Sequence, residues 1–147
     1  MSINVENVVV VQPKGMFSDP IIFDIEFECT VAIPTAIRWE VIYVGSATSH
    51  DYDQKLADVY VGPIEVGILR FVLKTDPPEM SKIPPEELPL TVVMLRALYN
   101  DHEFIRIGYY VSNTPPDDAG ENLDPNTVER QILEEDMTVH ATQIKWN

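Results

Sequence analysis

The chain has 147 residues, a length that fits one domain and is sufficient to bury a hydrophobic core. Its 45% of hydrophobic residues and its mean hydropathy of -0.06 are typical of a folded globular protein and exclude a disordered one. The 24 acidic residues outnumber the 10 basic residues and give a net charge of -14, which excludes direct binding to nucleic acid and favours a basic protein partner. Solubility alone also explains such a charge, so the charge indicates a function only together with a specific surface.

No apolar run is long enough to span a membrane, and the first residues lack the basic segment that begins a signal peptide. Cys29 is the single cysteine, so an intramolecular disulfide cannot form and a reducing compartment is favoured. Because Cys29 lies on an alternating segment, we expect a small buried hydrophobic side chain rather than a nucleophile.

Alternation of apolar and polar residues, with Pro and Gly turns between, predicts short strands through the first half of the chain. They cover Val5–Val11, Ile22–Thr30, Ile37–Val44, Asp58–Val61 and Ile68–Leu73. In the second of them, one face carries Phe23, Ile25, Phe27 and Cys29, and the other carries Asp24, Glu26 and Glu28. Such a strand has one face in the core and an acidic face in water. In the third, Trp39, Val41 and Tyr43 are expected to point inward.

Thr91–Val111 is predicted to form a long hairpin whose two faces are both apolar. A three-residue loop at Asn100-Asp101-His102 would place Tyr99 opposite Glu103, Met94 opposite Gly108 and Val92 opposite Tyr110. The expected core face then carries Val93, Leu95, Ala97, Tyr99, Ile105, Ile107, Tyr109 and Val111. The other face carries Arg106, which is costly to bury without a partner, so we expect that face to be the outer one. Its Tyr and Arg are residues typical of protein interfaces, although a loop or the other sheet could equally cover it.

After the hairpin we expect an exposed loop over Asn113–Asn122, a helix beginning at Asp124-Pro125, and a last strand over Thr138–Trp146. Val128, Ile132 and Leu133 would form the apolar side of that helix, and Pro84–Leu88 a single helical turn. The sequence therefore predicts an all-β fold, an immunoglobulin-like β-sandwich with one or two short helices in its connecting loops. A Cys and a Trp on successive strands (Cys29, Trp39) and a late Tyr109 match the core layout of immunoglobulin domains.

Five segments carry a resemblance to a known family. They are Tyr43–Ala47 (YVGSA), Tyr52–Gln54 (YDQ), Val61–Pro63 (VGP), Glu103–Val111 (EFIRIGYYV) and Ile144–Trp146 (IKW). With these motifs in this order, the chain resembles the anti-silencing-function histone chaperones from about Val5 to Trp146. The resemblance implies a single immunoglobulin-like histone-chaperone domain over residues 1–147, with no catalysis and no cofactor.

The resemblance further implies a partner and a cellular role. The partner is the heterodimer of histone three and histone four, which the chaperone keeps from forming a tetramer. The chaperone passes this heterodimer on in nucleosome assembly and disassembly, in the nucleus and during cytoplasmic escort, with other histone chaperones as further partners. The resemblance also implies that the protein is a monomer when no histone is bound.

Family positions transfer one at a time, and they define three groups of residues. The histone-three helix contact falls on Val92, Met94, Arg106, Tyr110, Asp53, Glu86 and Glu87. The histone-four tail contact falls on Ile107, Tyr109, Leu133 and Val139. The patch for partner chaperones falls on Thr35, Ala36, Ile37, Val61 and Phe71.

The chain departs from the family pattern in two of these groups. Thr35 and Ala36 replace an acidic pair, and Arg38 replaces an acidic residue, so binding of partner chaperones is in doubt. In the tail-binding strand, Met137–Ala141 keeps Val139 but lacks two flanking Arg residues. Main-chain pairing with a tail should survive, since it requires the backbone only.

Other functions are less well supported. His50, His102 and His140 have no metal-ligand spacing, and the Asp51–Asp53 segment lacks the Gly and Glu of a calcium loop. Ser49-His50-Asp51 are only neighbours in sequence, which does not define a catalytic triad. Two alternatives to a histone chaperone stay open on the residues alone: an immunoglobulin-like adaptor or cargo-binding module for another basic protein or ligand, and a β-sandwich enzyme with dispersed acidic catalysts.

Overall fold

The chain folds into nine strands and two single-turn 3-10 helices in the computed structural model, which describes residues 1–146. The strands are β1 (Ile3–Val10), β2 (Lys14–Met16), β3 (Ile22–Cys29), β4 (Ile37–Val44), β5 (Asp53–Val61), β6 (Gly67–Lys74), β7 (Leu90–Tyr99), β8 (His102–Thr114) and β9 (Glu129–Ala141). The 3-10 helices are η1 (His50–Tyr52) and η2 (Met80–Lys82).

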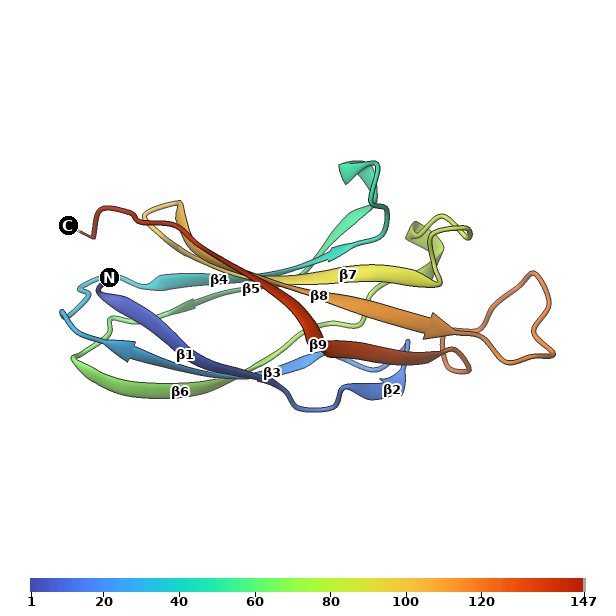
Figure 1. Cartoon of the computed structure of the whole chain (residues 1–147), viewed down its shortest axis with the longest axis horizontal. Helices are drawn as coiled ribbons and strands as arrows, with labels where there is room; N and C mark the ends of the chain where they lie inside the picture. Colours follow the sequence, from blue (N-terminus) through green and yellow to red (C-terminus); the bar gives the residue numbers. More distant parts are fainter. Residues whose placement is uncertain (147) are drawn as a thin grey trace.

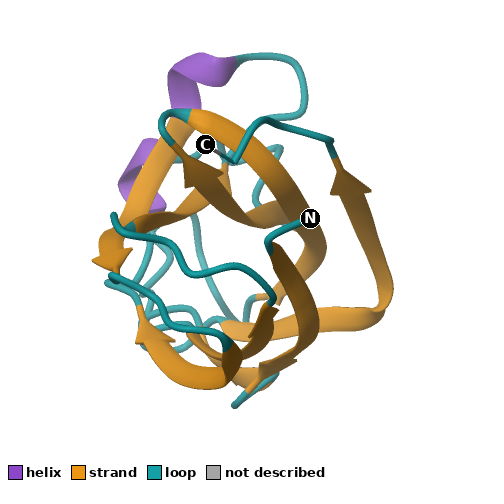
Figure 2. Cartoon of the chain, turned by 90° about the vertical axis from the view of Figure 1, so that its left-hand side faces the viewer, coloured by secondary structure: helices purple, strands orange, loops and turns teal. Residues whose placement is uncertain are grey.

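The strands form two antiparallel sheets that pack face to face (Figure 1). One sheet has the order β1-β3-β6, and the other has the order β2-β9-β8-β7-β4-β5. Viewed from the end that carries both termini, the two sheets curl around a common interior (Figure 2). This arrangement confirms the predicted immunoglobulin-like β-sandwich, in which β1, β3 and β6 face β4, β5, β7 and β8.

Alternating side chains of the facing sheets fill the interior. Phe23, Ile25, Phe27 and Cys29 of β3 are all 0–1% exposed, as predicted, and so are Trp39, Val41 and Tyr43 of β4. The Trp39 ring lies 6.0 Å from the Phe27 ring and 5.2 Å from the Phe71 ring, which joins β4 to β3 and β6. Aromatic contacts of this kind add to the hydrophobic stabilisation of the core.

The β7–β8 hairpin has the predicted faces but a different turn. Asn100 and Asp101 alone form the turn, both with positive φ (50° and 66°), so Tyr99 pairs with His102 and the predicted three-residue loop is wrong. A bulge at Phe104 then restores the predicted register, in which Met94 pairs with Gly108 and Val92 with Tyr110. The expected core face is buried except at Ile105, which is only partly buried.

The segment after the hairpin differs most from the prediction. Asp124 caps a single turn and does not begin the expected helix. Ile132 and Leu133 lie instead on β9, which starts at Glu129 and ends at Ala141. Pro84–Leu88 forms hydrogen-bonded turns, and the two short helices occur at η1 and η2 instead. The short strand β2 was not predicted. None of the helices in residues 1–146 has the length and apolar character of a membrane span.

Gly62 allows the end of β5 to lie against the loop before β4. Its φ of +144° is a backbone angle that residues with a side chain rarely adopt. A Cβ at this position would lie 2.7 Å from the carbonyl oxygen of Thr35. Gly67 has a similar φ of +146° but nothing within 4 Å, and Gly120 has neither constraint. Substituting each of the three glycines in turn therefore distinguishes the effect of backbone strain from that of steric overlap.

We expect Gly62→Ala to lower the free energy of unfolding by about 2–4 kcal/mol, because strain and overlap add. Gly67→Ala should lower it by about 1–2 kcal/mol through strain alone, and Gly120→Ala should change it by less than about 0.5 kcal/mol. Urea denaturation of the three variants measures this order. Equal stability of Gly62→Ala and Gly120→Ala would contradict the described backbone.

Candidate functional site

Two rows of side chains cross the outer face of the six-stranded sheet. Strand register places the first row from β5 to β9 as Asp53, Val44, Val92, Tyr110 and Leu133. The second row runs as Lys55, Ile42, Met94, Gly108 and Thr138. Paired residues of an antiparallel sheet point to the same side, so these ten positions form one surface.

We call the central part of this surface the apolar patch: Ile42, Val44, Val92, Met94, Gly108 and Tyr110. Tyr110 is 44% exposed, and the other five residues are partly exposed. The exposure of these residues confirms the prediction that this is the outer face of the hairpin. A small hollow of about 90 Å³ above Gly108 is lined by Val92, Tyr110 and Thr138. The missing side chain of Gly108 therefore leaves room for an apolar group at the centre of the patch.

The sequence prediction missed Ile42 and Val44, which extend the patch onto β4. The signal was present, because Trp39, Val41 and Tyr43 fill the inward phase of β4 and leave Ile42 and Val44 on the outward phase. An apolar residue on the outward phase of a half-buried strand is the same signal that identified Val92 and Met94.

Acidic side chains border one end of the apolar patch. Asp53 ends the first row, and its Oδ2 lies 3.2 Å from Nδ1 of the exposed His50. Its Oδ1 is buried and has no hydrogen-bond donor within the described residues. Glu86 is exposed and Glu87 partly exposed in the turn before β7, the strand that carries Val92. Asp53, whose side chain is 25% exposed, and the two glutamates therefore place negative charge beside the patch.

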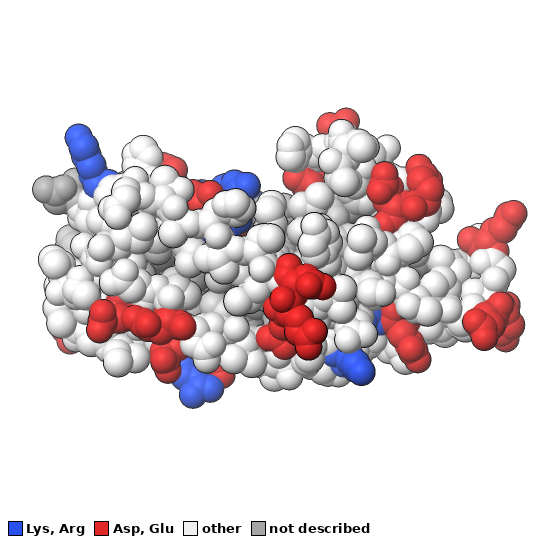
Figure 3. All heavy atoms as spheres, viewed as in Figure 1, with Lys and Arg blue, Asp and Glu red and all other residues white. Residues whose placement is uncertain are grey.

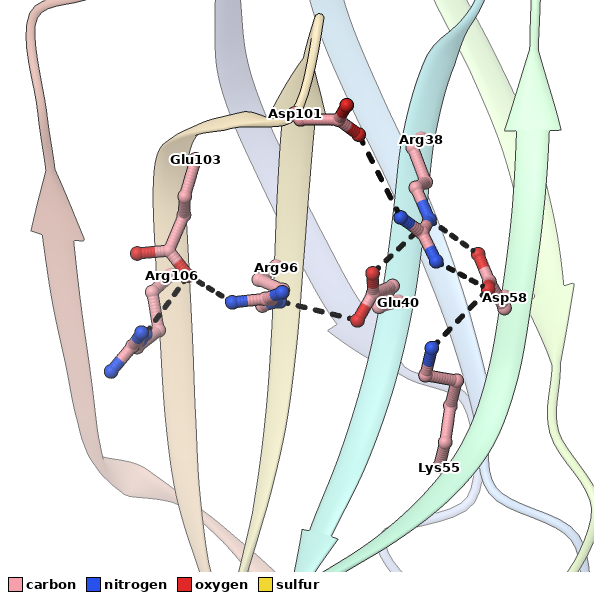
Figure 4. Close-up of polar contacts among 8 residues, drawn as sticks. All are labelled: Arg38, Glu40, Lys55, Asp58, Arg96, Asp101, Glu103 and Arg106. Atoms are coloured by element: carbon pink, nitrogen blue, oxygen red, sulfur yellow. Dashed lines mark hydrogen bonds and ion pairs between the residues drawn. The ribbon is translucent and has the colours of Figure 1, made fainter.

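Charged side chains of alternating sign form a ladder at the other end of the patch (Figure 4). Glu40 is 2% exposed and lies between two guanidinium groups, with 3.1 Å from its Oε1 to Arg38 Nε and 3.3 Å from its Oε2 to Arg96 Nε. Arg96 also contacts Glu103 at 3.4 Å, and Glu103 contacts Arg106 at 3.0 Å. Arg106, whose side chain is 41% exposed, is the end of the ladder closest to Tyr110 along β8.

Arg38 closes the opposite end of the ladder. Its Nε and Nη2 donate hydrogen bonds of 2.9 and 2.8 Å to the two carboxylate oxygens of Asp58. These bonds lower the pKa of Asp58 to about 2. Arg38 therefore lies on the outer face with its charge paired, whereas the sequence suggested a positive charge beside Thr35 and Ala36.

The four positions assigned to a histone-four tail lie at the junction of β8 and β9. Ile107 pairs with Val139, and Tyr110 with Leu133, while Tyr109 stands opposite the bulge formed by residues 134–137. Ile107 and Tyr109 are 5% and 0% exposed, so the interior is closed at these residues. Val139 is 52% exposed, and within residues 1–146 no strand pairs with the far edge of the second half of β9.

Tyr109 has an unusual environment next to this edge. Its hydroxyl is buried and has no hydrogen-bond partner in the described residues. Burial, together with the charge of Glu134, raises the pKa of Tyr109 to about 12, so the phenol is neutral. Glu134 itself accepts a hydrogen bond of 3.2 Å from the Val10 amide, which ties the β9 bulge to β1 of the other sheet.

The five positions assigned to partner chaperones do not form one exposed patch. Thr35 is exposed and Ala36 partly exposed, while Val61 and Phe71 are partly buried against the core on the edge strands β5 and β6. Ile37 is 0% exposed, so its side chain cannot contact a partner. Thr35 and Ala36 carry no charge.

No group of three or more His, Cys, Asp or Glu side chains among residues 1–146 has a geometry suited to a metal ion.

A sequence profile for the family described as "ASF1 like histone chaperone" matches residues 1–147. "Histone chaperone ASF1" of Mycosarcoma maydis is 38% identical, and the alignment covers 99% of this chain and 87% of that protein. "Histone chaperone asf1" of Dictyostelium discoideum is also 38% identical, with 99% and 98% covered. "Histone chaperone cia1" of Schizosaccharomyces pombe is 40% identical, and this chain spans 60% of its length.

Glu40 pairs with two guanidinium groups of the ladder, so we expect its carboxylate to stabilise the fold. We expect Glu40→Gln to lower the free energy of unfolding by about 1–3 kcal/mol, because Arg38 and Arg96 lose their shared charged partner at a buried position. The control is Glu6→Gln, which alters an exposed residue of β1 and should cost less than about 0.5 kcal/mol. Urea denaturation at neutral pH measures both, and equal stabilities would show that the ladder does not stabilise the fold.

Proposed function

This chain belongs to the family of ASF1-like histone chaperones, and we propose that it binds the histone-three/histone-four heterodimer, blocks its tetramerisation and passes it on in nucleosome assembly and disassembly. The apolar patch carries this proposal. Val92, Met94 and Tyr110 lie open on a sheet face of a protein with a net charge of -14, a combination suited to a basic and amphipathic partner.

The histone-three contact is a helix laid across the patch. One apolar side chain of this helix enters the hollow of about 90 Å³ above Gly108, and its neighbours cover Val92, Met94 and Tyr110. A histone surface occupied in this way is unavailable to a second heterodimer, which is how the chaperone prevents a tetramer. The buried apolar centre supplies most of the affinity.

Charged groups around the patch orient the helix. The partly exposed carboxylate of Asp53 pairs with a histone Lys or Arg, and Glu86 and Glu87 attract further basic side chains. Arg106 is held by Glu103 and is available to a histone carboxylate. Rim pairs of this kind raise the association rate and the specificity more than the affinity.

The histone-four tail adds as a strand to the free edge of β9. Main-chain hydrogen bonds to Thr138–Ala141 require no particular side chains, so the loss of the flanking Arg residues is tolerated. Val139 supplies an exposed apolar contact and Leu133 a partly exposed one, and the buried Ile107 and Tyr109 form the floor beneath them. In this proposal the two histone contacts lie on the same sheet, one on its face and one at its edge.

The relatives named as histone chaperones support a role in chromatin, and we propose that this chain acts in the nucleus and during cytoplasmic histone escort. We further propose a single domain over residues 1–147 that is monomeric when free, without enzymatic activity. A pull-down with purified core histones tests the whole proposal, since failure to retain a stoichiometric histone-three/histone-four dimer at moderate salt would refute it.

We expect Val92→Arg to weaken binding of the histone heterodimer at least about 30-fold, because a charge is placed under the apolar face of the helix. The domain should stay folded, since Val92 is partly exposed. The matched control is Val72→Arg on β6 of the other sheet, where Val72 is 62% exposed, and histone binding should be unchanged. Circular dichroism and a binding titration report both outcomes; an unfolded Val92→Arg protein would place Val92 in the core and overturn the assignment of faces.

We expect basic peptides of partner chaperones to bind this chain weakly. Thr35 and Ala36 supply no negative charge, and Ile37 is buried. The double variant Thr35→Glu/Ala36→Asp should bind such a peptide at least about tenfold more tightly, because two charges meet Lys or Arg at the rim. Isothermal titration calorimetry compares the two proteins, and tight binding to the unmodified chain would show that the acidic pair is not required.

A further inference from the structure

A groove at one end of the sandwich is used by neither histone contact. It lies between the β6–β7 connection and the β8–β9 connection and has a volume of about 630 Å³. Its apolar lining includes Met80, Ile83, Leu88 and Leu123, together with four prolines. Ile83 and Leu88 are 5% and 4% exposed and form the floor, while Met80 and Leu123 are partly exposed at its sides. We call this feature the end groove.

The charge of the protein is concentrated around the end groove. The two connecting segments, residues 76–89 and 115–126, carry eight acidic residues and one Lys, a net charge of -7 that is half of the -14 of the chain. Glu79 and Glu121 belong to the lining itself, and Lys82 is paired with Glu79 at 3.4 Å. In Figure 3 acidic side chains predominate at the right-hand end of the molecule, which holds these two connections.

Buried side-chain amides fix one wall of the groove. Gln54 Nε2 donates a hydrogen bond of 2.9 Å to the Glu79 carbonyl, and the Glu79 amide donates one of 2.8 Å to Gln54 Oε1. Asn113 Nδ2 donates a hydrogen bond of 2.8 Å to the Leu88 carbonyl. These bonds come from β5 and β8 and hold the β6–β7 connection at two points. The wall therefore keeps its shape without a ligand, which lowers the conformational cost of binding.

The opposite wall is also attached to the sandwich. The Ser18 amide donates a hydrogen bond of 3.2 Å to the Pro125 carbonyl, and the Phe17 amide donates one of 2.8 Å to the Val128 carbonyl. Asp124 accepts a hydrogen bond of 2.9 Å from the Asn126 amide and caps the turn between them. The groove thus lies between two braced segments.

We propose that the end groove is a docking site for an extended, basic polypeptide segment, in which an apolar side chain enters the groove between flanking Lys or Arg residues. The apolar floor selects the central side chain, and the net charge of -7 around it selects the flanking residues. The same charge repels anionic lipid headgroups and nucleic acid, so a basic protein segment is the occupant that fits. The lining of the end groove contains no residue of the apolar patch, although Glu86 and Glu87, counted in the net charge of -7, also belong to the proposed histone-three contact.

The test uses synthetic peptides and the intact chain. The probes are the acetylated heptapeptides KRKLKRK and KRKAKRK, which have the same charge and differ in the central side chain. Amide chemical shifts of the 15N-labelled protein locate the contact, and calorimetry gives the affinity. We expect KRKLKRK to shift the amides of Met80, Ile83 and Leu123 and to bind at least about fivefold more tightly than KRKAKRK.

Three variants separate docking in the groove from general charge attraction. Leu123→Ser and Met80→Ser each change a partly exposed lining residue without adding charge, and each should reduce the affinity for KRKLKRK to that for KRKAKRK. Glu6→Lys reverses an exposed charge on β1, away from the groove, and should leave the preference for Leu unchanged. The preference for Leu over Ala in the unmodified protein is itself a test, even if one variant fails to fold.

The outcomes also separate this proposal from the histone function. Val92→Arg should weaken histone binding and retain the preference for KRKLKRK, because Val92 lies outside the groove. Equal binding of the two peptides, or shifts spread over the acidic surface without the groove residues, would overturn the docking site and leave the histone proposal intact.

Discussion

The register of the β7–β8 hairpin is the constraint on which the other surfaces depend. A shift of one residue would exchange the two faces of a strand, placing Val92 and Arg106 in the core and Val93 and Tyr109 in water. The Asn100-Asp101 turn fixes the pairing at one end, since two successive residues of positive φ match the twist of the strands. The bulge at Phe104 then sets the pairing from Ala97 onward. Val44 and Leu133 join the first row of the outer face only because their strands pair with this hairpin.

The charge ladder divides the outer face into a paired polar end and an open apolar end. Its carboxylates and guanidinium groups alternate across β4, β7 and β8, so each charge has a partner on a neighbouring strand. Burial of Glu40 at 2% exposure is tolerated because two guanidinium groups flank it. The uncompensated negative charge of the protein is therefore not on this part of the sheet, and much of it lies in the connections beyond Val92 and around the end groove.

Alternation predicted the strands whose two faces differ clearly. The bounds of β4 and the buried set of β3 follow from period two alone, and the two faces of the hairpin follow once Arg106 is placed in water. The resemblance supplied the family, which periodicity does not reveal. The Asn100-Asp101 turn had a readable signal, because Asn and Asp are residues that adopt positive φ, but the bulge at Phe104 that restores the register had none.

The start of β9 was misread for a different physical reason. Val128, Arg130 and Ile132 are all buried and alternate as a strand, but Arg130 reads as polar and conceals that pattern. Arg130 is buried because its guanidinium donates hydrogen bonds to the carbonyls of Phe17, Asp19 and Pro20, and only the tertiary fold brings those acceptors together. Without Arg130, the spacing of Val128 and Ile132 fits one side of a helix, and Asp124-Pro125 supplies a helix start.

The same dependence on distant partners explains why the end groove was not visible in the sequence. One of its walls is fixed by Gln54 and Asn113, two polar residues that are buried because each satisfies a carbonyl of the β6–β7 connection. Gln54 belongs to the Tyr52–Gln54 motif, whose Asp53 faces the apolar patch. One short motif therefore serves two surfaces, since alternation sends Asp53 to the outer face and Gln54 inward toward the groove wall. A substitution of Gln54 would release the wall at Glu79, whereas a substitution of Asp53 would act on the patch alone.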